Sequence, residues 1–395
     1  MREGWEYKKL GEVCADMTKG PFGSDIKKSL YVPKSSDTYK VYIQVNAIAK
    51  DPSLGDYYIS KEYFDSKMHR FEVKPSDYII TCDGTLGKYL KLPENIEKGI
   101  ISSSLLRLTL NDKIICGYFE YIWEYYVLRK LAKDTRNSAL VHLPAASKIA
   151  KVEIPYPSLS TQESIVSELD KINELISLKK EQLKDYDNLA QSIFYDMFGD
   201  PVTNDKGWEV KKYGDCFAIG SGGTPSKSNP LYWDNGNIPW IGSNMCQNCI
   251  ITETDGKYIT SEGLKNSSAK MLDPGTVLVA LVGATIGKVA LLRISTSTNQ
   301  NIAFIKVNEN KLFFPEFVYY HLMNQYDEFM LIGNGDFKMA NQAFIKSLTI
   351  MMPPLSLQQA FAKRIEAIEK QKQLISSEIK DLETLLASRM QYWFD

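Results

Sequence analysis

The chain has 395 residues, of which 44% are hydrophobic and 24% are charged, a composition that excludes a largely disordered protein and favours two folded domains. Its net charge of −1 argues against a free-standing DNA-binding protein, because neutralising phosphate groups ordinarily requires a basic excess. No run of about 18 apolar residues occurs, and the charged first ten residues contain no apolar leader, so we expect a cytoplasmic protein. The six cysteines are too sparse for a disulfide scaffold.

Three motifs occur twice along the chain, in the same order and with nearly constant spacing. Such repetition indicates two copies of one unit, about 1–200 and 201–395. The pairs are WEYKKLGEVC (5–14) with WEVKKYGDC (208–216), PSDYIITCDGTLGKYLKL (75–92) with PGTVLVALVGATIGKVALL (274–292), and PSLSTQE (157–163) with PLSLQQ (354–359).

The first part of each copy has the pattern of a mixed α+β globule. Short apolar runs separated by Gly, Pro and Asn predict strands, and aromatic segments predict short helices. The predicted strands are 39–45, 77–82, 276–282 and 301–307, and the predicted helices are 118–126 and 317–326.

The last part of each copy predicts a long helix. Ser160 with Glu163, and Ser356 with Gln359, fit the capping box S-x-x-E/Q, and each follows prolines that a helix interior does not tolerate. Both helices then carry a 4-3 heptad repeat, and an offset of 196 residues relates the two seams. We expect these residues to pair the helices: Ile165, Leu169, Ile172, Ile176, Leu183, Tyr186, Ile193 and Met197 in the first, and Phe361, Ile365, Ile368, Ile375, Ile379, Leu382, Leu386 and Trp393 in the second.

Helices this long and apolar on one side need a partner, and each copy offers one to the other. We expect an antiparallel coiled coil separating two similar domains, with approximate two-fold symmetry; the alternative is an ordinary amphipathic helix packed on its own domain. Basic residues interrupt the seams at Lys179, Lys372 and Arg389. The expected domains are 1–158 and 201–354, with helices over 159–200 and 355–395.

The motifs give no support for catalysis by this chain. GTLGK (84–88) and GATIGK (283–288) fail the spacing of a phosphate loop and lack its Ser or Thr after the lysine. None of the three histidines, His69, His142 and His321, recurs at an equivalent position. The pair Cys246 and Cys249 has no second pair at zinc-site spacing, and no methyltransferase motif is present, so we expect neither a metal site nor a catalytic site.

The glycine loops and three polar segments are instead suited to DNA, since glycine lets the backbone approach closely and Asn, Gln, Ser and Thr hydrogen-bond base edges. The same residue types also form ordinary turns, so each member has two interpretations. The polar segments are SGGTPSKSN (221–229), IPWIGSNM (238–245) and STNQNI (297–302).

The order SGGTP, IPWIG, GATIGK, NQNI and PPLSLQQ resembles the specificity subunit of type I restriction-modification systems over essentially the whole chain. The second copy matches the pattern best; the first departs from it, with KGPFGS (19–24) in place of the TP loop. Such divergence is what two different half-sites would require. The DNA contacts that the resemblance implies are Lys19, Ser24, Lys27, Gln44, Asn46, Thr85 and Lys88 in the first copy, and Ser221, Gly222, Thr224, Ser226, Lys227, Asn244, Thr285, Lys288, Gln300 and Asn301 in the second.

The resemblance also implies that each domain recognises one half of a split DNA sequence and that the helices set the spacer. Two methyltransferase subunits would dock on the helices, bringing S-adenosylmethionine, and two motor-nuclease subunits using ATP and magnesium would join for cleavage. Such partners would supply positive surface that this chain lacks. Two other classes stay open: a standalone nuclease or methyltransferase with a recognition module, and a coiled-coil scaffold that binds only protein.

Overall fold

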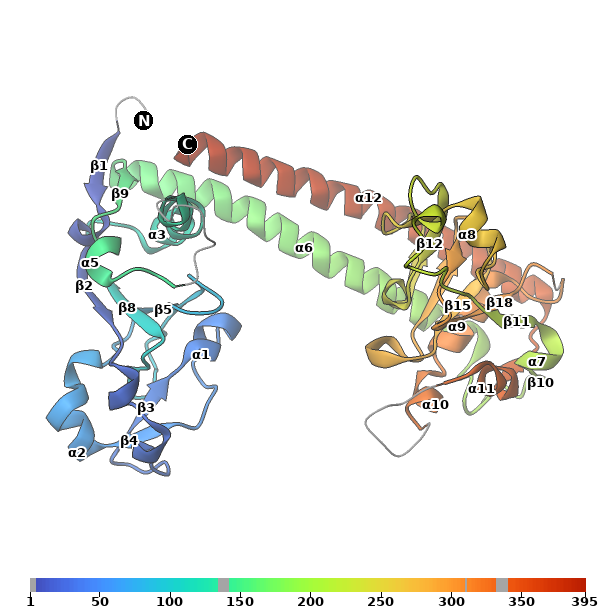
Figure 1. Cartoon of the computed structure of the whole chain (residues 1–395), viewed down its shortest axis with the longest axis horizontal. Coiled ribbons are helices and arrows are strands. Elements are labelled where there is room, and N and C mark those ends of the chain that lie inside the picture. The colour runs from blue at the N-terminus through green and yellow to red at the C-terminus, as the bar shows by residue number, and fades with distance from the viewer. Residues whose placement is uncertain (1–4, 134–141, 310, 332–339) are drawn as a thin grey trace. The chain divides into compact units, whose positions relative to one another are not determined.

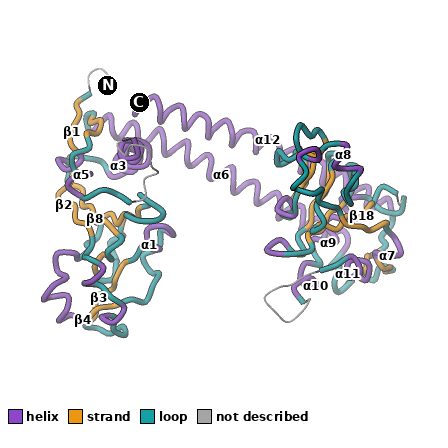
Figure 2. The backbone as a smooth tube through the Cα atoms, viewed as in Figure 1, coloured by secondary structure: helices purple, strands orange, loops and turns teal. Residues whose placement is uncertain are grey.

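A computed structural model describes residues 5–133, 142–309, 311–331 and 340–395. The chain divides into two compact units, a first unit of Met1–Leu178 with Lys380–Asp395 and a second unit of Lys179–Ile379. Each unit contains one globule and a part of both long helices, α6 (Leu159–Phe198) and α12 (Leu355–Phe394) (Figure 1). Strands lie in the globules and not along the long helices (Figure 2).

The globule of the first unit is built on two sheets. The larger one is antiparallel, and in the smaller one β3 and β7 run parallel. The strand order is β2 (Cys14–Lys19), β8 (Leu105–Leu110), β5 (Tyr78–Thr81), β6 (Tyr89–Lys91) in the larger sheet and β4 (Tyr58–Ser60), β3 (Thr38–Tyr42), β7 (Gly99–Ile101) in the smaller.

The globule of the second unit repeats this plan. Its larger sheet has four strands in the same order as those of the first unit. A fifth strand, β13, pairs in parallel at one edge. The order is β11 (Ala218–Ser221), β18 (Ile302–Lys306), β15 (Val277–Ala280), β16 (Val289–Leu292), β13 (Cys249–Ile251), and the smaller sheet is β14 (Tyr258–Ile259), β12 (Ile238–Ile241), β17 (Ser297–Thr298). Mixed sheets in two similar domains confirm the predicted α+β class.

Short helices pack on these sheets, as the aromatic segments predicted. The segment 39–45 corrects the sequence analysis, because the strand ends at Tyr42 and a helix begins at Gln44. Asn46 accepts a hydrogen bond from Ile43 N at 2.8 Å, which stabilises that helix start. The α-helices are α1 (Gln44–Ala49), α2 (Lys61–Tyr63), α3 (Cys116–Ile122), α4 (Leu128–Lys133), α5 (Ala146–Ile149), α7 (Tyr213–Cys216), α8 (Ser261–Lys265), α9 (Pro315–Met323), α10 (Tyr326–Met330) and α11 (Gln342–Ser347).

A two-stranded ribbon in each unit ties the start of the copy to the segment that leads into its long helix. In the first unit β1 (Glu6–Lys9) pairs with β9 (Glu153–Tyr156), and in the second β10 (Val210–Lys212) pairs with β19 (Thr349–Met351). The repeated WEYKK and WEVKK motifs thus form equivalent strands.

The residues that cap the long helices differ from the predicted ones. Ser160 and Ser356 lie inside the first turn, and in α6 the cap is Ser158, whose Oγ accepts from Thr161 N at 3.3 Å. The proposed capping boxes are therefore wrong, since the first helical residues, Leu159 and Leu355, precede the serines that were expected to cap the helices.

A buried glutamine in each copy anchors the helix start instead. Gln162 donates to Pro157 O at 3.0 Å and accepts from Ile115 N at 3.0 Å. Gln358 makes the same bonds, donating to Pro353 O at 3.0 Å and accepting from Phe314 N at 3.0 Å. Both side chains are almost fully buried, so each one fixes a long helix to its globule.

The two long helices run antiparallel, as predicted. In the second unit Lys179 pairs with Glu378 at 2.7 Å, and further along α6 Asp187 pairs with Lys372, earlier in α12, at 2.7 Å. Every predicted helix-pairing residue is buried or half-buried. Among the described residues, no helix combines the length and the apolar character needed to cross a bilayer.

The apolar stripes of both helices also pack on the globules, so the alternative interpretation holds in part. In the second unit Phe194 and Phe198 of α6 join Phe361 of α12 in the core of the globule. The rings of Phe198 and Phe317 meet edge to face, with their centroids 4.8 Å apart. Phe194 and Phe198 lie outside the heptad seam, so the heptad pattern did not predict their burial. Their burial fixes the helices rigidly to the sheet that carries the candidate site.

Candidate nucleic-acid interface

A glycine held against a neighbouring strand begins the polar loop of each unit. Gly20 N donates to Leu105 O at 2.8 Å, and a Cβ at Gly20 would lie 1.9 Å from Ser102 O. In the second unit a Cβ at Gly222 would lie 2.1 Å from Thr298 O. Only glycine fits at both positions, so the two loops leave their sheets at equivalent places.

The polar loop of the second unit is joined to two other predicted segments. Thr224 Oγ1 donates to Gln300 Oε1, and Gln342 Nε2 donates to Ser221 Oγ at 2.9 Å. Trp240 Nε1 donates to Gly223 O at 2.9 Å. These bonds bring SGGTP, IPWIG and NQNI to one surface.

A pocket of about 390 Å³ opens on that surface, and it includes residues that the sequence analysis missed. The rings of Trp233 and Trp240 meet edge to face at 5.2 Å, and Lys257 Nζ pairs with Asp255 at 2.6 Å. Trp233 and Trp240, the tryptophan of IPW, lie close together in the sequence, and this could have predicted an aromatic pocket. The lining is Lys227, Trp233, Trp240, Gly242, Asn244, Lys257 and Asn299, of which Lys227 and Asn244 were predicted.

The glycine motifs form tight hairpins between strands. Gly84 and Gly87 have φ of 65° and 72°, and Gly283 and Gly287 both have φ of 74°, a conformation that favours glycine. Each hairpin leads into a strand, whereas a phosphate loop leads into a helix.

Lysines follow both hairpins and differ in their surroundings. Lys88 is exposed, whereas Lys288 is half-buried and its Nζ donates to Gln247 Oε1 at 2.7 Å. The backbone of Asn301 is joined to the hairpin through Leu281 N. Lys288 can therefore meet a phosphate while Gln247 orients it.

Asn46 and Gly222 are corrections to the predicted DNA contacts. Asn46 is fully buried, and its amide donates to Asp51 O at 3.0 Å and Leu54 O at 2.8 Å. Gly222 is buried against Thr298. Both residues shape their loops and are not available to a base. Gln44, by contrast, lies with its Oε1 3.9 Å from where a Cβ on Gly84 would stand.

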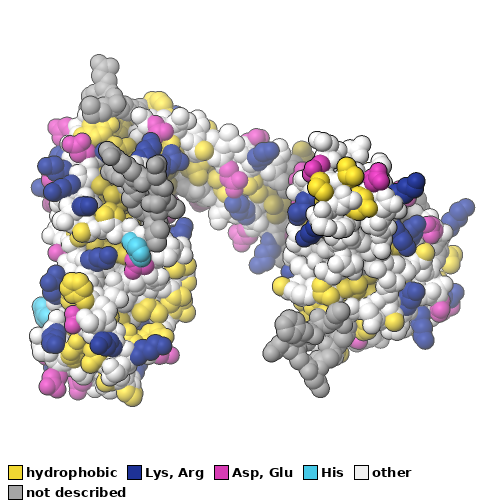
Figure 3. Space-filling model, in the orientation of Figure 1, with side chains coloured by type: hydrophobic (Ala, Val, Ile, Leu, Met, Phe, Trp, Pro, Cys, Tyr) yellow, Lys and Arg dark blue, Asp and Glu magenta, His cyan; other side chains and the backbone are white. Residues whose placement is uncertain are grey.

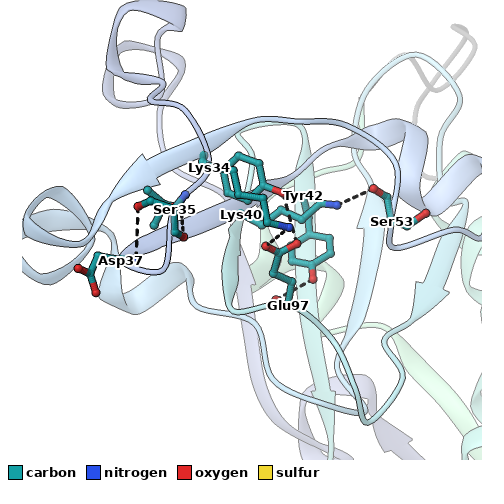
Figure 4. Close-up of polar contacts among 9 residues, drawn as sticks. Lys34, Ser35, Asp37, Lys40, Tyr42, Ser53 and Glu97 are labelled. Atoms are coloured by element: carbon teal, nitrogen blue, oxygen red, sulfur yellow. Dashed lines mark hydrogen bonds and ion pairs between the residues drawn. The ribbon is translucent and has the colours of Figure 1, made fainter.

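A buried lysine holds the loop that follows α1 (Figure 4). Lys40 Nζ donates to Ser53 O at 2.8 Å, and burial lowers the pKa of Lys40. On the same side Lys34 pairs with Glu97 at 2.8 Å, and Tyr42 donates to Glu97 O at 2.8 Å. This network fixes β3 and so the position of Gln44.

The remaining predicted contacts are accessible to differing degrees. Ser24, Lys27, Thr85, Lys88, Ser226, Lys227, Asn244 and Gln300 are exposed, and Lys19, Gln44, Ser221, Thr224, Thr285, Lys288 and Asn301 are half-buried. Figure 3 shows Lys and Arg side chains scattered over both units among uncharged surface. Such surfaces suit polar contacts supplemented by local positive charge.

Two groups considered for chemistry have environments that favour a structural role. Burial lowers the pKa of His321 to about 3, so the ring stays neutral between Tyr213 and the backbone of Met351. Burial raises the pKa of the Cys246 thiol, which disfavours the thiolate that a metal would need.

Two equivalent polar loop surfaces, each on a rigid α+β globule fixed to paired long helices, define a duplicated recognition protein. The family model described as "Type I restriction modification DNA specificity domain" matches residues 2–185 and 205–384. The chain belongs to this family.

Individual relatives agree with this assignment. The MjaVIII specificity subunit of Methanocaldococcus jannaschii is 23% identical over 417 aligned positions, covering 97% of this chain and 92% of the relative. The EcoR124I/EcoR124II specificity subunit of Escherichia coli is 30% identical over 172, and that match covers only 41% of each chain. Thus the chain matches less than half the length of this second relative.

The fold is also found among solved structures. One, from a study titled "Structural basis underlying complex assembly and conformational transition of the type I R-M system", has a TM-score of 0.61 at 18% identity and covers 99% of this chain and 97% of its own. At this identity the likeness shows the fold.

Proposed function

We propose that the chain is a non-catalytic subunit that reads a bipartite DNA target, one block per unit, with the long helices setting the gap. The observation that carries this proposal is the repeated loop geometry with unlike side chains. The glycine-anchored loop presents Phe22 in the first unit and Thr224 in the second, each two residues after the anchoring glycine. Two different half-sites would require the same loop backbone in each unit to carry different base-contacting side chains.

Recognition in each unit combines phosphate and base contacts. The lysines after the hairpins, Lys88 and Lys288, would meet phosphates, which position the protein without reading sequence. Side chains such as Asn244 and Gln300 would hydrogen-bond base edges. Because the loops are bonded to strands, little ordering entropy is lost when DNA binds.

Alanine substitution of Asn244 and Gln300 together tests the division of labour. We expect relaxed specificity, about 1–3 kcal/mol per lost base contact, confined to one block of the target. The matched control is Thr85→Ala with Ser24→Ala, which should relax the other block. Relaxation of both blocks by one double variant would contradict the assignment of one block per unit.

Exposed leucines support docking of partner subunits on the long helices. Leu178 of α6 and Leu374 of α12 are equivalent under the 196-residue offset, and so are Leu189 and Leu385. All four are exposed, and each unit contains one from each helix: Leu178 and Leu385 in the first, Leu374 and Leu189 in the second. Two equivalent apolar sets favour two copies of one partner.

The partners would be two methyltransferase subunits carrying S-adenosylmethionine and, for cleavage, two motor-nuclease subunits using ATP and magnesium. Changing Leu178 and Leu385 to Glu should lower the methyltransferase stoichiometry from two to one in analytical ultracentrifugation. Leu231→Glu, at an exposed leucine of the second globule, is the control and should leave it at two. Unchanged stoichiometry in the double variant would place docking elsewhere.

A further inference from the structure

Phe22 is the most exposed of the large hydrophobic side chains in the described part of the chain, at 82%. It lies in KGPFGSD, next to the polar loop residues, yet the residues implied by the resemblance did not include it. An aromatic ring left in water forgoes the free energy that its burial would contribute. Such a ring calls for an explanation from its surroundings.

The loop that presents Phe22 is rigid. Gly20 is fixed against Ser102, Pro21 is buried, and Asp25 N donates to Phe22 O at 2.8 Å. Tyr63 donates its hydroxyl hydrogen to Asp25 O at 2.8 Å, which ties the loop to the helical turns 61–71. Phe22 is thus held in solvent by a preorganised backbone, so little backbone ordering accompanies its contact with a partner.

A groove of about 910 Å³ adjoins Phe22 and is basic. Lys19, Lys67 and Arg70 line it, against the single carboxylate of Asp25. Among the described residues these three cations form no ion pair with a carboxylate. Lys67 Nζ lies 5.9 Å from the ring centroid of Tyr63, and the Arg70 guanidinium lies 4.9 Å from that of Phe71. Lys67 and Arg70 come from helical turns that no motif singled out.

We propose that Phe22 inserts between two stacked bases of the DNA bound by the first unit, while Lys19, Lys67 and Arg70 hold the flanking phosphates. An aromatic ring beside cations that have no carboxylate partner fits DNA better than protein, because the cations match the phosphates on either side of an opened base step. Insertion partly unstacks that step and kinks the duplex. This inference rests on the proposed DNA-recognition function.

In the described part of the second unit no exposed aromatic ring stands at the equivalent position, so the proposed deformation is one-sided. At the equivalent position Thr224 is half-buried and bonded to Gln300. Only one block of the split target should therefore be unstacked by this chain, and the other block serves as an internal control.

The test uses the full chain with its methyltransferase subunit and duplexes carrying the methylated motif. 2-Aminopurine, an adenine analogue that pairs with thymine, replaces each adenine on either strand in and beside the two blocks in turn. The methylated adenine is left out, since a methyltransferase flips that base. We expect increased fluorescence at one step of one block. Phe22→Ala should abolish the increase and weaken binding about tenfold, the size of one lost base–aromatic stack. The salt dependence of DNA binding should be the same for Phe22→Ala as for the wild type.

Two matched variants separate the roles. Lys67→Ala and Arg70→Ala should keep the fluorescence increase and each reduce the log–log salt slope by about 0.9. Leu231→Ala, at another exposed apolar residue, should change neither. Wild-type affinity in Phe22→Ala, or loss of methyltransferase assembly by that variant, would overturn the inference. Failure of the wild-type complex to select its motif would instead refute the proposed function.

Discussion

Arg389 of α12 donates two hydrogen bonds to the carboxylate of Glu168 of α6, 221 residues earlier in the chain, with Nη2 3.0 Å from Oε2. The other basic interruptions of the seam behave alike, Lys179 with Glu378 and Lys372 with Asp187. Each therefore has a carboxylate partner on the opposite helix. A shift of register would separate the charges, so these pairs specify how the helices align.

Replacing Glu168 with Gln should make the first unit less stable at neutral pH. The bonds from Arg389 hold the pKa of Glu168 below its usual range, so this stabilisation is present above pH 4.3 and is lost as the pH falls through the lowered pKa. The difference in melting temperature from the wild type, about 1–3 °C at pH 7, should shrink as the pH falls below 4.3 and disappear once the carboxyl is protonated in the folded protein. Glu163→Gln is the matched control. A difference in melting temperature that is as large at pH 3 as at pH 7 would contradict the role of the charge.

Gly20→Ala should destabilise the protein because its Cβ would meet Ser102 O at 1.9 Å. We expect a loss of about 1–3 kcal/mol in the free energy of unfolding, measured by urea denaturation. Gly23→Ala, three residues on, is the control, since nothing lies within 4 Å of its Cβ position. Equal stability of the two variants would mean that the loop is not anchored at Gly20.

His321 should make the second unit sensitive to mild acid. Its pKa of about 3 in the folded protein lies below 6.5 in the unfolded chain, so between these values the unfolded chain binds more protons. Stability should fall with decreasing pH in this window, by up to about 1.4 kcal/mol per pH unit. His321→Gln should reduce that slope in denaturation series from pH 7 to pH 4. An identical slope in both proteins would exclude His321 as its source.

Lys288→Ala should weaken DNA binding and lower the log–log salt slope by about 0.9 if this lysine meets a phosphate. Lys306→Ala, which removes a lysine paired with Glu309 at 2.9 Å, should leave the slope unchanged. The measurement is fluorescence anisotropy of the complex with methyltransferase over a range of salt. An unchanged slope in Lys288→Ala would leave this residue the structural partner of Gln247 alone.

The features predicted from sequence are those with a local or repeated signal. Heptad spacing marked the long helices, and duplication of GTLGK as GATIGK marked equivalent hairpins, because helical periodicity and positive φ depend on nearby residues. The buried anchors Gln162 and Gln358 were missed although they too are repeated. Their role depends on backbone groups more than 40 residues away, at Ile115 and Phe314.

The candidate site was predictable at the level of loops and less so at the level of side chains. Asn46 and Asn244 occupy corresponding places after β3 and β12, yet Asn46 is buried in a helix start and Asn244 is exposed. Burial of a polar side chain depends on the tertiary fold around it, which residue type does not reveal. Phe22 was missed for the opposite reason, because an apolar residue is expected to be buried whereas Phe22 is exposed.

The most direct test of the account is single-molecule mapping of N6-methyladenine in DNA from cells carrying this chain with its methyltransferase subunit, against cells lacking only this chain. We predict a motif of two short specified blocks around a fixed unspecified gap, present only with the chain. Methylation that is absent in both strains, or that follows one motif whether or not the chain is present, would contradict its role as the subunit that reads DNA.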